Sequence, residues 1–330
     1  MSGCSGCARG ATTTPSRAEV YGVRLAWEDL PGQVRGWVEE VLGAPVARAV
    51  SQPGGFSPGS ADRVVTTSGR RAFVKAVSDR PNPGTPALHR REIEVLRDLT
   101  DLPEVPRLLA SEDDGEWVVL VVEDVEGRHP HLPWRQEEVD ATLTTLRGLA
   151  DRRAPGAWPA LPEVLAEEMG ACRRLGEAPD VLEALHPWLV QRMDELVELC
   201  DRTLPRLAGD RVCHLDVRAD NLLVGADGRV RLVDWPWAAR GAPWTDAASL
   251  LVNVRWGGDL DLRPHLDAVL DLGAEPEDVL GLVAGLAGLF TEAARTPPAP
   301  GLPTLREFQR QQAVAATRVL EELWTWARPG

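Results

Sequence analysis

Two carboxylates and an asparagine lie close together in the stretch VCHLDVRADNLLVGADGRVRLVDW, residues 212–235. His214, Asp216 and Asn221 follow the pattern HxDxxxxN, and Asp234 comes 13 residues after the asparagine, at the end of an apolar run. A carboxylate such as Asp216 can accept the proton of an attacking hydroxyl. A second carboxylate and an amide oxygen can hold Mg²⁺, which prefers hard oxygen ligands. The pattern therefore indicates phosphoryl-transfer chemistry, with Asp216 as the base and with Asn221 and Asp234 as metal ligands.

The composition indicates that Lys75 could take part in the same chemistry. Of the 36 Lys and Arg residues, only Lys75 is a lysine. It lies in RRAFVKAV, residues 70–77, whose alternation is typical of a half-buried strand, and it follows the glycine-bearing stretch 51–60. A compact ammonium on this strand could reach the phosphates of a nucleotide, where a planar guanidinium would be a poor substitute. The alternative is that arginine-rich coding left one lysine by chance.

Strands dominate the first part of the chain, which has to position Lys75. Period-2 alternation bounded by turn residues predicts strands, and helical spacing of apolar residues predicts two helices. The expected strands cover residues 45–52, 61–67, 71–77, 107–111 and 116–123, and the expected helices cover residues 33–43 and 86–99. Strands with one helix inserted after the third indicate a small antiparallel α+β lobe.

Helices dominate the chain beyond Gly127. They are expected at residues 137–150, 161–175, 181–204, 246–254, 277–294 and 305–327, with one strand pair at 221–224 and 230–233. The pattern predicts a disordered tail (1–18), an N-lobe (19–123), a hinge (124–127) and a mainly helical C-lobe (128–330). A cleft between two lobes is the natural place for a ligand.

The stretch HLDVRADN…LVDW resembles the catalytic segment of the aminoglycoside phosphotransferase and choline kinase-like family, relatives of the protein kinases. The resemblance runs from about Val34 to Trp326 and includes the PGGFS loop, the VK strand, a glutamate-bearing helix, LVVEDVEGR and GAPWTDAASLL. It implies a bilobal, protein kinase-like α+β fold that uses ATP or GTP with Mg²⁺. Arg218, Pro236 and the irregular glycine spacing depart from the usual pattern, in which histidine, glycine and GxGxxG are common.

The resemblance implies a role for each matching position. Lys75 would contact the α- and β-phosphates and be fixed by Glu92, which its register in the helix favours over Glu94. Asp216 would be the catalytic base. Arg218 stands where the family often has histidine, and it would keep a donor near the transferring phosphate. The expected metal ligands are Asn221 and Asp234.

Backbone groups would supply the other nucleotide contacts that the resemblance implies. The loop residues Gly54, Gly55, Phe56 and Ser57 would cover the phosphates, although the two glycines could instead form a simple turn. Residues 123–125, and in particular Glu123 and Val125, would face the purine. His214 and Asp246 are expected to brace the catalytic loop.

A peptide acceptor is disfavoured, because only eleven residues separate Asp234 from Asp246, too few for a peptide-docking platform. A catalytically silent nucleotide-binding protein is a second alternative. The presence of Lys75, Asp216, Asn221 and Asp234 counts against it.

We expect an aminoglycoside-type or other antibiotic as the hydroxylated acceptor. A metabolic kinase for choline, homoserine or a sugar is the alternative. Carboxylates and tryptophans could hold a cationic or apolar acceptor, or could equally be surface charges and core aromatics: Glu163, Glu167, Glu168, Glu292, Trp237, Trp244 and Trp256.

Charge and hydropathy argue against a nucleic-acid-binding, membrane-spanning or secreted protein. The net charge of −14 argues against nucleic acid as a partner, since phosphate backbones bind basic surfaces. The longest apolar run, Val279 to Phe290, is too short to span a bilayer, and the N-terminus lacks the apolar core of a signal peptide. We therefore expect a cytoplasmic protein. A monomer or weak dimer is a separate expectation. Cys4 and Cys7 form a CxxC without a second ligand pair, so a chance pair in the tail is favoured over a metal or redox site.

Overall fold

The computed structural model describes residues 24–52, 55, 58–80, 82–178, 180, 185–298 and 300–327. The expected tail with Cys4 and Cys7 lies outside the described residues, as do Gly54, Phe56 and Ser57 of the glycine loop.

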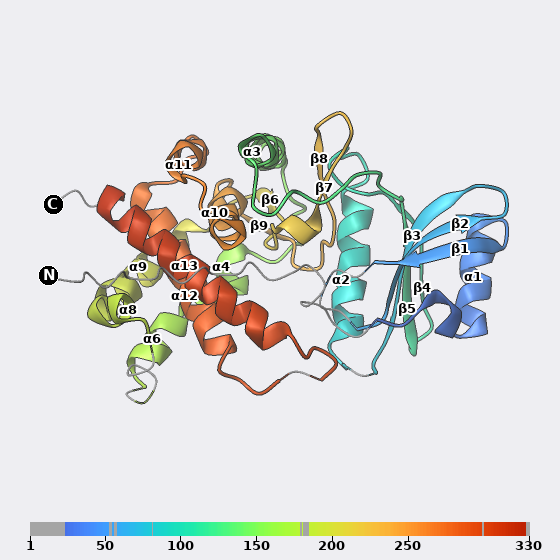
Figure 1. Ribbon diagram of the computed structural model, residues 1–330, viewed down its shortest axis with the longest axis horizontal. Helices are drawn as coiled ribbons and strands as arrows, with labels where there is room; N and C mark the ends of the chain where they lie inside the picture. Colours follow the sequence, from blue (N-terminus) through green and yellow to red (C-terminus); the bar gives the residue numbers. More distant parts are fainter. Residues whose placement is uncertain are drawn as a thin grey trace, which may run out of the picture.

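A five-stranded antiparallel sheet forms the first lobe (Figure 1). Its strand order is β1-β2-β3-β5-β4, with β1 at Val46–Ser51, β2 at Ser60–Thr66, β3 at Arg71–Ser78, β4 at Leu108–Asp113 and β5 at Trp117–Val122. Alternate residues of β5 face opposite sides because side chains on a strand have period 2. Val119 and Val121 pack with α1 (Gly32–Leu42) and η1 (Trp27–Asp29), whereas Val118 and Leu120 pack with α2 (Thr85–Asp98). Helix α2 lies between the sheet and the second lobe (Figure 1).

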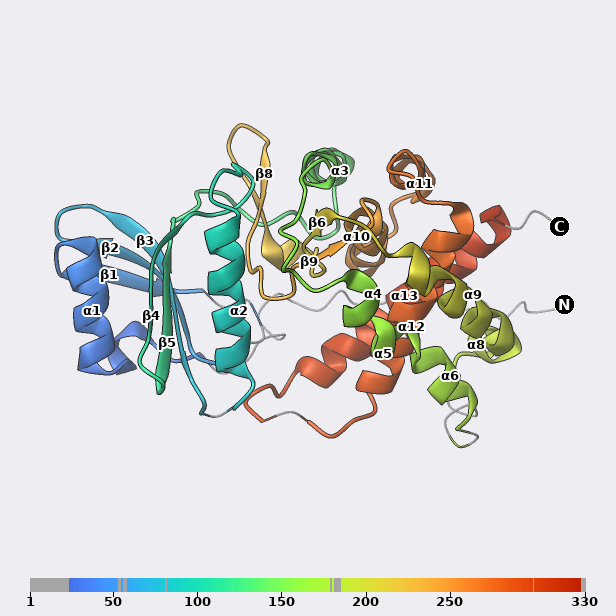
Figure 2. The same ribbon diagram turned by 180° about the vertical axis from the view of Figure 1, so that it is seen from behind.

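The second lobe is mainly helical, so the expected two-lobed α+β fold is confirmed. Helix α12 (Pro276–Ala293) lies at its centre and packs against α13 (Leu305–Ala327) and α9 (Met193–Arg206). Figure 2 shows the molecule from behind, with the short helices α4 (Leu161–Val164), α5 (Ala166–Met169), α6 (Ala171–Gly176) and α8 (Pro187–Gln191) in view. The other helices are α3 (Gln136–Ala150), α10 (Thr245–Gly257) and α11 (Arg263–Leu270). None of the helices in the described residues is long and apolar enough to cross a membrane.

Two short antiparallel ribbons carry the catalytic segment. The expected pair is present as β7 (Leu222–Val224) and β8 (Val230–Leu232). A second pair, β6 (Arg211–Cys213) with β9 (Ala239–Gly241), was not expected, because no turn joins its two strands and the segment that contains Asp216 and Asp234 lies between them in the chain.

Two expected long helices are wrong in extent. Residues 161–175 form three short helices, α4, α5 and α6, interrupted at Leu165 and Gly170. Glycine disfavours a helix interior, so a break at Gly170 agrees with its sequence. The helix expected at 181–204 is described only from α8 onwards, where Arg192, with φ of −119°, separates α8 from α9. Residues 181–184 lie outside the described residues.

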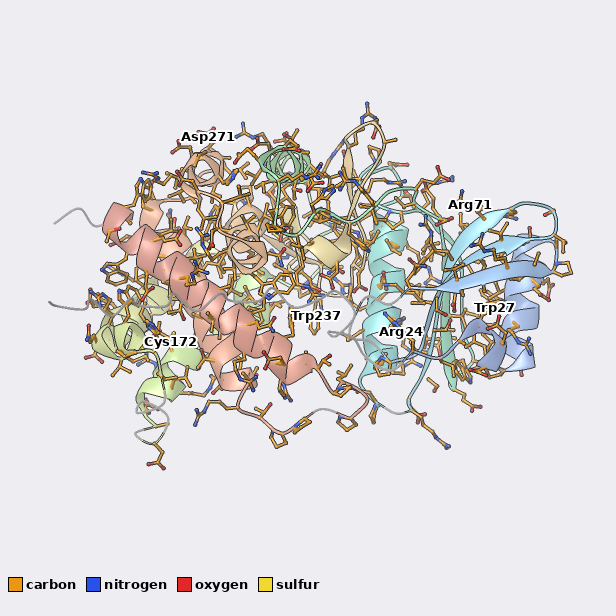
Figure 3. The ribbon with its side chains drawn as sticks, viewed as in Figure 1. Arg24, Trp27, Arg71, Cys172, Trp237 and Asp271 are labelled. Atoms are coloured by element: carbon orange, nitrogen blue, oxygen red, sulfur yellow. The ribbon has the colours of Figure 1, made fainter. Side chains whose placement is uncertain are left out.

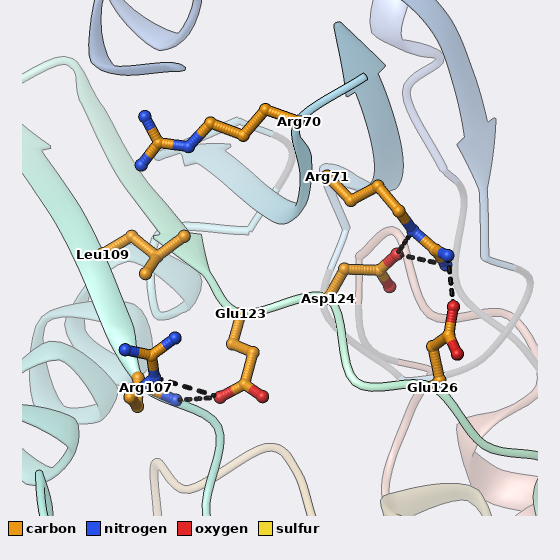
Figure 4. A pocket seen from close by; sticks show the side chains of 7 residues that line it. All are labelled: Arg70, Arg71, Arg107, Leu109, Glu123, Asp124 and Glu126. Atoms are coloured by element: carbon orange, nitrogen blue, oxygen red, sulfur yellow. Dashed lines mark hydrogen bonds and ion pairs between the residues drawn. The ribbon is translucent and has the colours of Figure 1, made fainter. Parts of the chain in front are cut away.

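Charged side chains hold the connection between the lobes. Asp124 accepts hydrogen bonds from Arg63 at 2.6 Å and from Arg71 at 2.8 Å. Figure 4 shows Arg71 and Asp124 at a cavity of about 330 Å³, with Arg71 also reaching Glu126 and Arg107 reaching Glu123. The connection is therefore tied to the β2–β3 hairpin of the first lobe.

An arginine of the second lobe completes the link. Arg231 of β8 donates to the two carboxylate oxygens of Glu123 at 2.8 and 3.1 Å, and to the carbonyl of Val105 at 3.1 Å. The hydrogen bonds from Arg231 lower the pKa of Glu123 to about 2, against the opposing effect of burial. This bidentate pair stabilises the relative position of the lobes.

We predict opposite effects of alanine at two helical glycines. A Cβ on Gly281 in α12 would lie 2.0 Å from Thr203 Oγ1 and 2.8 Å from the Leu199 carbonyl, so Gly281→Ala should destabilise the fold by about 1–3 kcal/mol. Gly148 in α3 has no atom within 4 Å of the corresponding position, so Gly148→Ala should stabilise by about 0.5–1 kcal/mol. Urea unfolding midpoints measure both. Equal shifts in the same direction would contradict this account of α12 packing.

We also predict that the Glu123–Arg231 pair contributes stability only at higher pH. Because the folded pKa of Glu123 is about 2 against an ordinary 4.5, its contribution is present above about pH 4.5 and is lost as the pH falls towards 2. Glu123→Gln should therefore unfold at lower urea than the wild type near neutral pH, and the difference should shrink across that window. Glu116→Gln is the control, since that exposed carboxylate forms none of the ion pairs seen among the described residues. A difference independent of pH would argue against the ion pair.

Candidate active site

A cavity of about 400 Å³ lies between the two lobes. Of the residues expected at a nucleotide site, it brings together Gly55, Lys75, Glu92, Glu123, Val125, Asn221 and Asp234. Groups up to 179 positions apart in the chain thus share one cavity.

Lys75 lies at the centre of the charged part of this cavity. Its ammonium on β3 donates to both carboxylate oxygens of Glu92 at 2.8 Å and to Asp234 Oδ1 at 2.7 Å. Glu92 comes from the inner face of α2, whereas Glu94 points outward and pairs with Arg91. The three groups join β3, α2 and the segment after β8, and the Lys75 side chain is only 14% exposed.

The pKa values follow from this contact. Burial would lower the pKa of Lys75, but Asp234 and Glu92 outweigh it and the pKa is raised. Burial would raise the pKa of Asp234, but the neighbouring ammonium more than offsets this and holds it well below its usual range. Lys75 is therefore charged and Asp234 is ionised at neutral pH.

Asp234 and Leu215 have backbone conformations that are rare for residues with a side chain. Their φ angles are 71° and 65°, in the left-handed region. Contacts with neighbouring residues hold both residues in this conformation. Asp246, at the start of α10, accepts the amides of His214 at 2.7 Å and Leu215 at 2.9 Å. The fully buried Trp235, which follows Asp234, donates its ring N–H to the carbonyl of Leu232 at 2.9 Å. Backbone strain of this kind is common at functional sites.

Asp216 lies beside Asn221 in the catalytic loop. The Asn221 amide donates to the Asp216 carbonyl at 2.9 Å and to its Oδ2 at 2.8 Å. Burial raises the pKa of Asp216 to about 6, although the charge of Arg218 opposes the rise. The carboxylate is therefore oriented by its neighbours and can still accept a proton.

Arg218 is held between two carboxylates. Its guanidinium makes a two-point contact with Asp220, at 2.9 and 3.0 Å, and lies 3.1 Å from Asp216 Oδ1. Phe308 of α13 covers the guanidinium, with its ring centre 5.0 Å away. Burial disfavours the charge, but Asp216 and Asp220 more than compensate, so the pKa of Arg218 is raised. Arg218 is thus a fixed cation next to Asp216.

The oxygen atoms of Asn221 and Asp234 suit a hard cation. Asp234 Oδ1 contacts Lys75, and the Asn221 amide nitrogen contacts Asp216. The other oxygens, Asp234 Oδ2 and Asn221 Oδ1, take part in no hydrogen bond among the described residues, and both residues line the cavity. No cluster of three or more His, Cys, Asp or Glu that could hold a metal occurs in the described part of the chain. This donor set fits Mg²⁺, which typically uses one or two protein ligands and completes its shell with water and phosphate oxygens.

The connection between the lobes offers backbone groups to the same cavity. The carbonyl of Glu123 and the amide of Val125 form none of the hydrogen bonds found within the described residues. The Glu123 side chain instead turns to Arg231, and the Val125 carbonyl accepts from Arg63 at 2.8 Å. Polar contacts with a ligand at these two positions would therefore come from the Glu123 carbonyl and the Val125 amide.

Sequence reasoning missed several residues at the site. Arg24 and His89 line the cavity, and Asp220 and Phe308 hold Arg218. Burial, with the charge of Lys75, lowers the pKa of His89 to about 4, so its ring is neutral. Asp220 lies inside the HxDxxxxN motif and could have been noticed, whereas no local signal marks the other three.

The aromatic and acidic residues expected to bind an acceptor have mixed positions. Trp237 is 50% exposed and lies where the two lobes meet (Figure 3). Trp244 is buried in the core. Trp256 packs against Phe308 at 6.2 Å between ring centres. Glu292 pairs with Arg174, so it is an ion-paired surface group. Glu163, Glu167 and Glu168 lie on α4 and α5, and none lines the cavity between the lobes.

Comparison with solved structures agrees with the fold. An aminoglycoside phosphotransferase from Alicyclobacillus acidocaldarius aligns with a TM-score of 0.56 and 19% identity, covering 90% of this chain and 96% of that one. The choline kinase LicA from Streptococcus pneumoniae aligns with a TM-score of 0.56 and 16% identity, covering 89% and 98%. The aminoglycoside phosphotransferase APH(4)-Ia, in a ternary complex with ADP and hygromycin B, aligns with a TM-score of 0.52 and 14% identity, covering 88% and 97%. At these identities the likeness shows a shared fold.

Sequence comparison gives the family. No curated protein sequence matches the chain. The sequence model of the phosphotransferase enzyme family, however, matches residues 56–286, which include Lys75 and the whole catalytic segment. The resemblance seen in the sequence is thereby confirmed, and the chain belongs to the phosphotransferase enzyme family.

Proposed function

We propose that the protein transfers the γ-phosphoryl group of ATP or GTP, with Mg²⁺, to a hydroxyl group of a small molecule. One observation carries this proposal: Lys75, Glu92 and Asp234 meet in the cavity between the lobes, next to the Asp216–Asn221 pair. Phosphoryl transfer depends mainly on positioning and on charge stabilisation, and these groups supply both. In this scheme the N-lobe at 19–123 binds the nucleotide, residues 124–127 are the hinge, and the C-lobe at 128–330 binds the acceptor.

Each residue has a step in the proposed reaction. Asp216 accepts the proton of the acceptor hydroxyl as its oxygen forms a bond to the γ-phosphorus, and the bond to the bridging oxygen breaks to release the nucleoside diphosphate. Lys75 orients the phosphates, and Arg218 lies beside Asp216 as a cation for the charge of the transferring group. Asn221 and Asp234 would hold Mg²⁺, which neutralises charge on the phosphate oxygens when bound.

The purine would bind at the connection between the lobes. The free backbone carbonyl of Glu123 and amide of Val125 can pair with the edge of a purine ring. Gly55 lies at the same cavity and would cover the phosphates together with Gly54, Phe56 and Ser57. The ternary complex of APH(4)-Ia contains ADP, which agrees with nucleotide binding by a protein of this fold.

We favour an antibiotic of the aminoglycoside type as the acceptor. Two of the aligned structures are aminoglycoside phosphotransferases, and one of them is in complex with hygromycin B. The exposed ring of Trp237 could bind a cation or a sugar face. The similarity to a choline kinase supports the alternative of a metabolic acceptor such as choline, homoserine or a sugar. Cytoplasmic location, GTP use, the absence of nucleic-acid or membrane partners, and a monomeric or weakly dimeric state stay predictions.

The first test is an acceptor screen. Purified protein with ATP and Mg²⁺ should add one phosphate to at least one hydroxylated amine, macrolide, choline-like alcohol or sugar, as read by mass shift.

Asp216→Asn should lower turnover by about 10²–10⁴-fold, because it removes the proton acceptor, while the affinity for ATP stays close to that of the wild type. Asp227→Asn is the control, since this exposed residue lies in the β7–β8 turn, away from the cavity. Full turnover by Asp216→Asn would exclude Asp216 as the base. ATP binding without transfer to any acceptor would favour the silent nucleotide-binding protein.

A second test concerns the geometry of the lysine. Lys75→Arg keeps the charge but replaces a compact ammonium that contacts three carboxylate oxygens within 2.8 Å. The planar group cannot make these contacts in the same space, so kcat/KM should fall by about 10²-fold. Steady-state kinetics measure the loss, and thermal unfolding shows whether the variant is folded. Wild-type activity in Lys75→Arg would show that charge alone suffices at this position.

A further inference from the structure

The charged side chains around the proposed phosphate site have little net positive charge with which to bind a nucleoside triphosphate. Lys75 is shared between Glu92 and Asp234, so this triad carries one more negative than positive charge. Four more charged residues of the cavity form ion pairs: Arg63 with Asp124, Glu123 with Arg231, and Asp220 with Arg218. A nucleoside triphosphate stays anionic even with one Mg²⁺ bound. A further cation at this place would therefore strengthen its binding.

Arg24 lies where such a cation is needed. It precedes η1 and lines the same cavity as Lys75, Gly55 and Asp234. A parallel bridge between Arg24 and Gly59, with the Leu25 amide donating to the Gly59 carbonyl at 3.0 Å, fixes its backbone beside the start of β2. Trp27, three residues later, is buried in the core of α1 and the sheet, which anchors the segment from the other side (Figure 3).

The guanidinium of Arg24 lies against Gly55. A Cβ on Gly55 would lie 2.8 Å from Arg24 Nη2, and Gly55 has a φ of 85°. A side chain at position 55 would therefore be strained and would displace the guanidinium. Burial disfavours the charge of Arg24 and lowers its pKa, whereas the nearby carboxylates Asp234 and Asp62 oppose this. The cation thus lies beside Gly55, in the cavity that Lys75 and Asp234 also line.

We propose that Arg24 is a second phosphate-binding cation of the nucleotide site, contacting the β- or γ-phosphate opposite Lys75. The inference rests on the proposed function, because it assumes that a nucleoside triphosphate occupies this cavity. Arginine is suited to the role, since its planar fork can bind two phosphate oxygens at once. Arg24 lies outside residues 56–286, so the segment before the family-matched region contributes to the site.

Binding of AMP, ADP and ATP in the presence of Mg²⁺ tests the inference. Calorimetry on the full chain should show that Arg24→Gln weakens ATP binding by about tenfold, the size expected for losing a charge-assisted hydrogen bond. AMP binding should change little, because AMP lacks the β- and γ-phosphates. Arg24→Lys should recover part of the loss, since it restores the charge without the fork. Arg48→Gln is the matched control, because Arg48 is an exposed arginine of β1 that does not line the cavity.

The outcomes separate this inference from the proposed function. An equal loss for AMP and ATP, or no recovery in Arg24→Lys, would show that Arg24 only supports the local structure at Gly55. Unchanged ATP binding in Arg24→Gln would overturn the role of Arg24 and leave the proposed function intact. A wild-type protein that binds none of the three nucleotides would overturn both.

Discussion

The contact of one ammonium with two carboxylates organises the site. Lys75 comes from the sheet, Glu92 from the helix behind it, and Asp234 from the other lobe. Each carboxylate alone would be unfavourable in a buried place, because transfer from water removes its hydration. The shared lysine makes both tolerable, and it thereby fixes the distance between the lobes at the cleft. A bound nucleotide has to fit a spacing that this contact already sets.

The catalytic loop is rigid for a related reason. Leu215 and Asp234 have left-handed backbone conformations, and such strain persists only where the surroundings enforce it. Asp246 holds the amides of His214 and Leu215 from the start of α10, and the ring of His214 packs edge-on against that of Trp235. The side chains that face the cleft therefore stand on a backbone with little freedom. Preorganisation of this kind lowers the reorganisation that a reaction requires.

Arginine is the cation in most of the other ion pairs among the described residues. Arg231 joins the lobes through Glu123, and Arg218 is clamped by Asp216 and Asp220. Arg24 enters the cleft from a segment that precedes the first helix. The planar group gives each contact a fixed direction, which a flexible ammonium would not. Lys75, by contrast, is a compact ammonium that three carboxylate oxygens surround.

The amino-acid sequence alone was enough to predict the two-lobed α+β fold, most of its helices and strands, and the hairpin between Asn221 and Asp234. These features are local: period-2 and helical patterns act over a few residues, and a short hairpin returns Asp234 towards Asn221. It could not show that Arg24 enters the cleft, that Phe308 covers Arg218, or that residues 161–176 form three helices. Contacts between residues separated by many positions depend on how the elements pack. Only the tertiary structure decides that packing, because no periodic pattern encodes which faces finally meet.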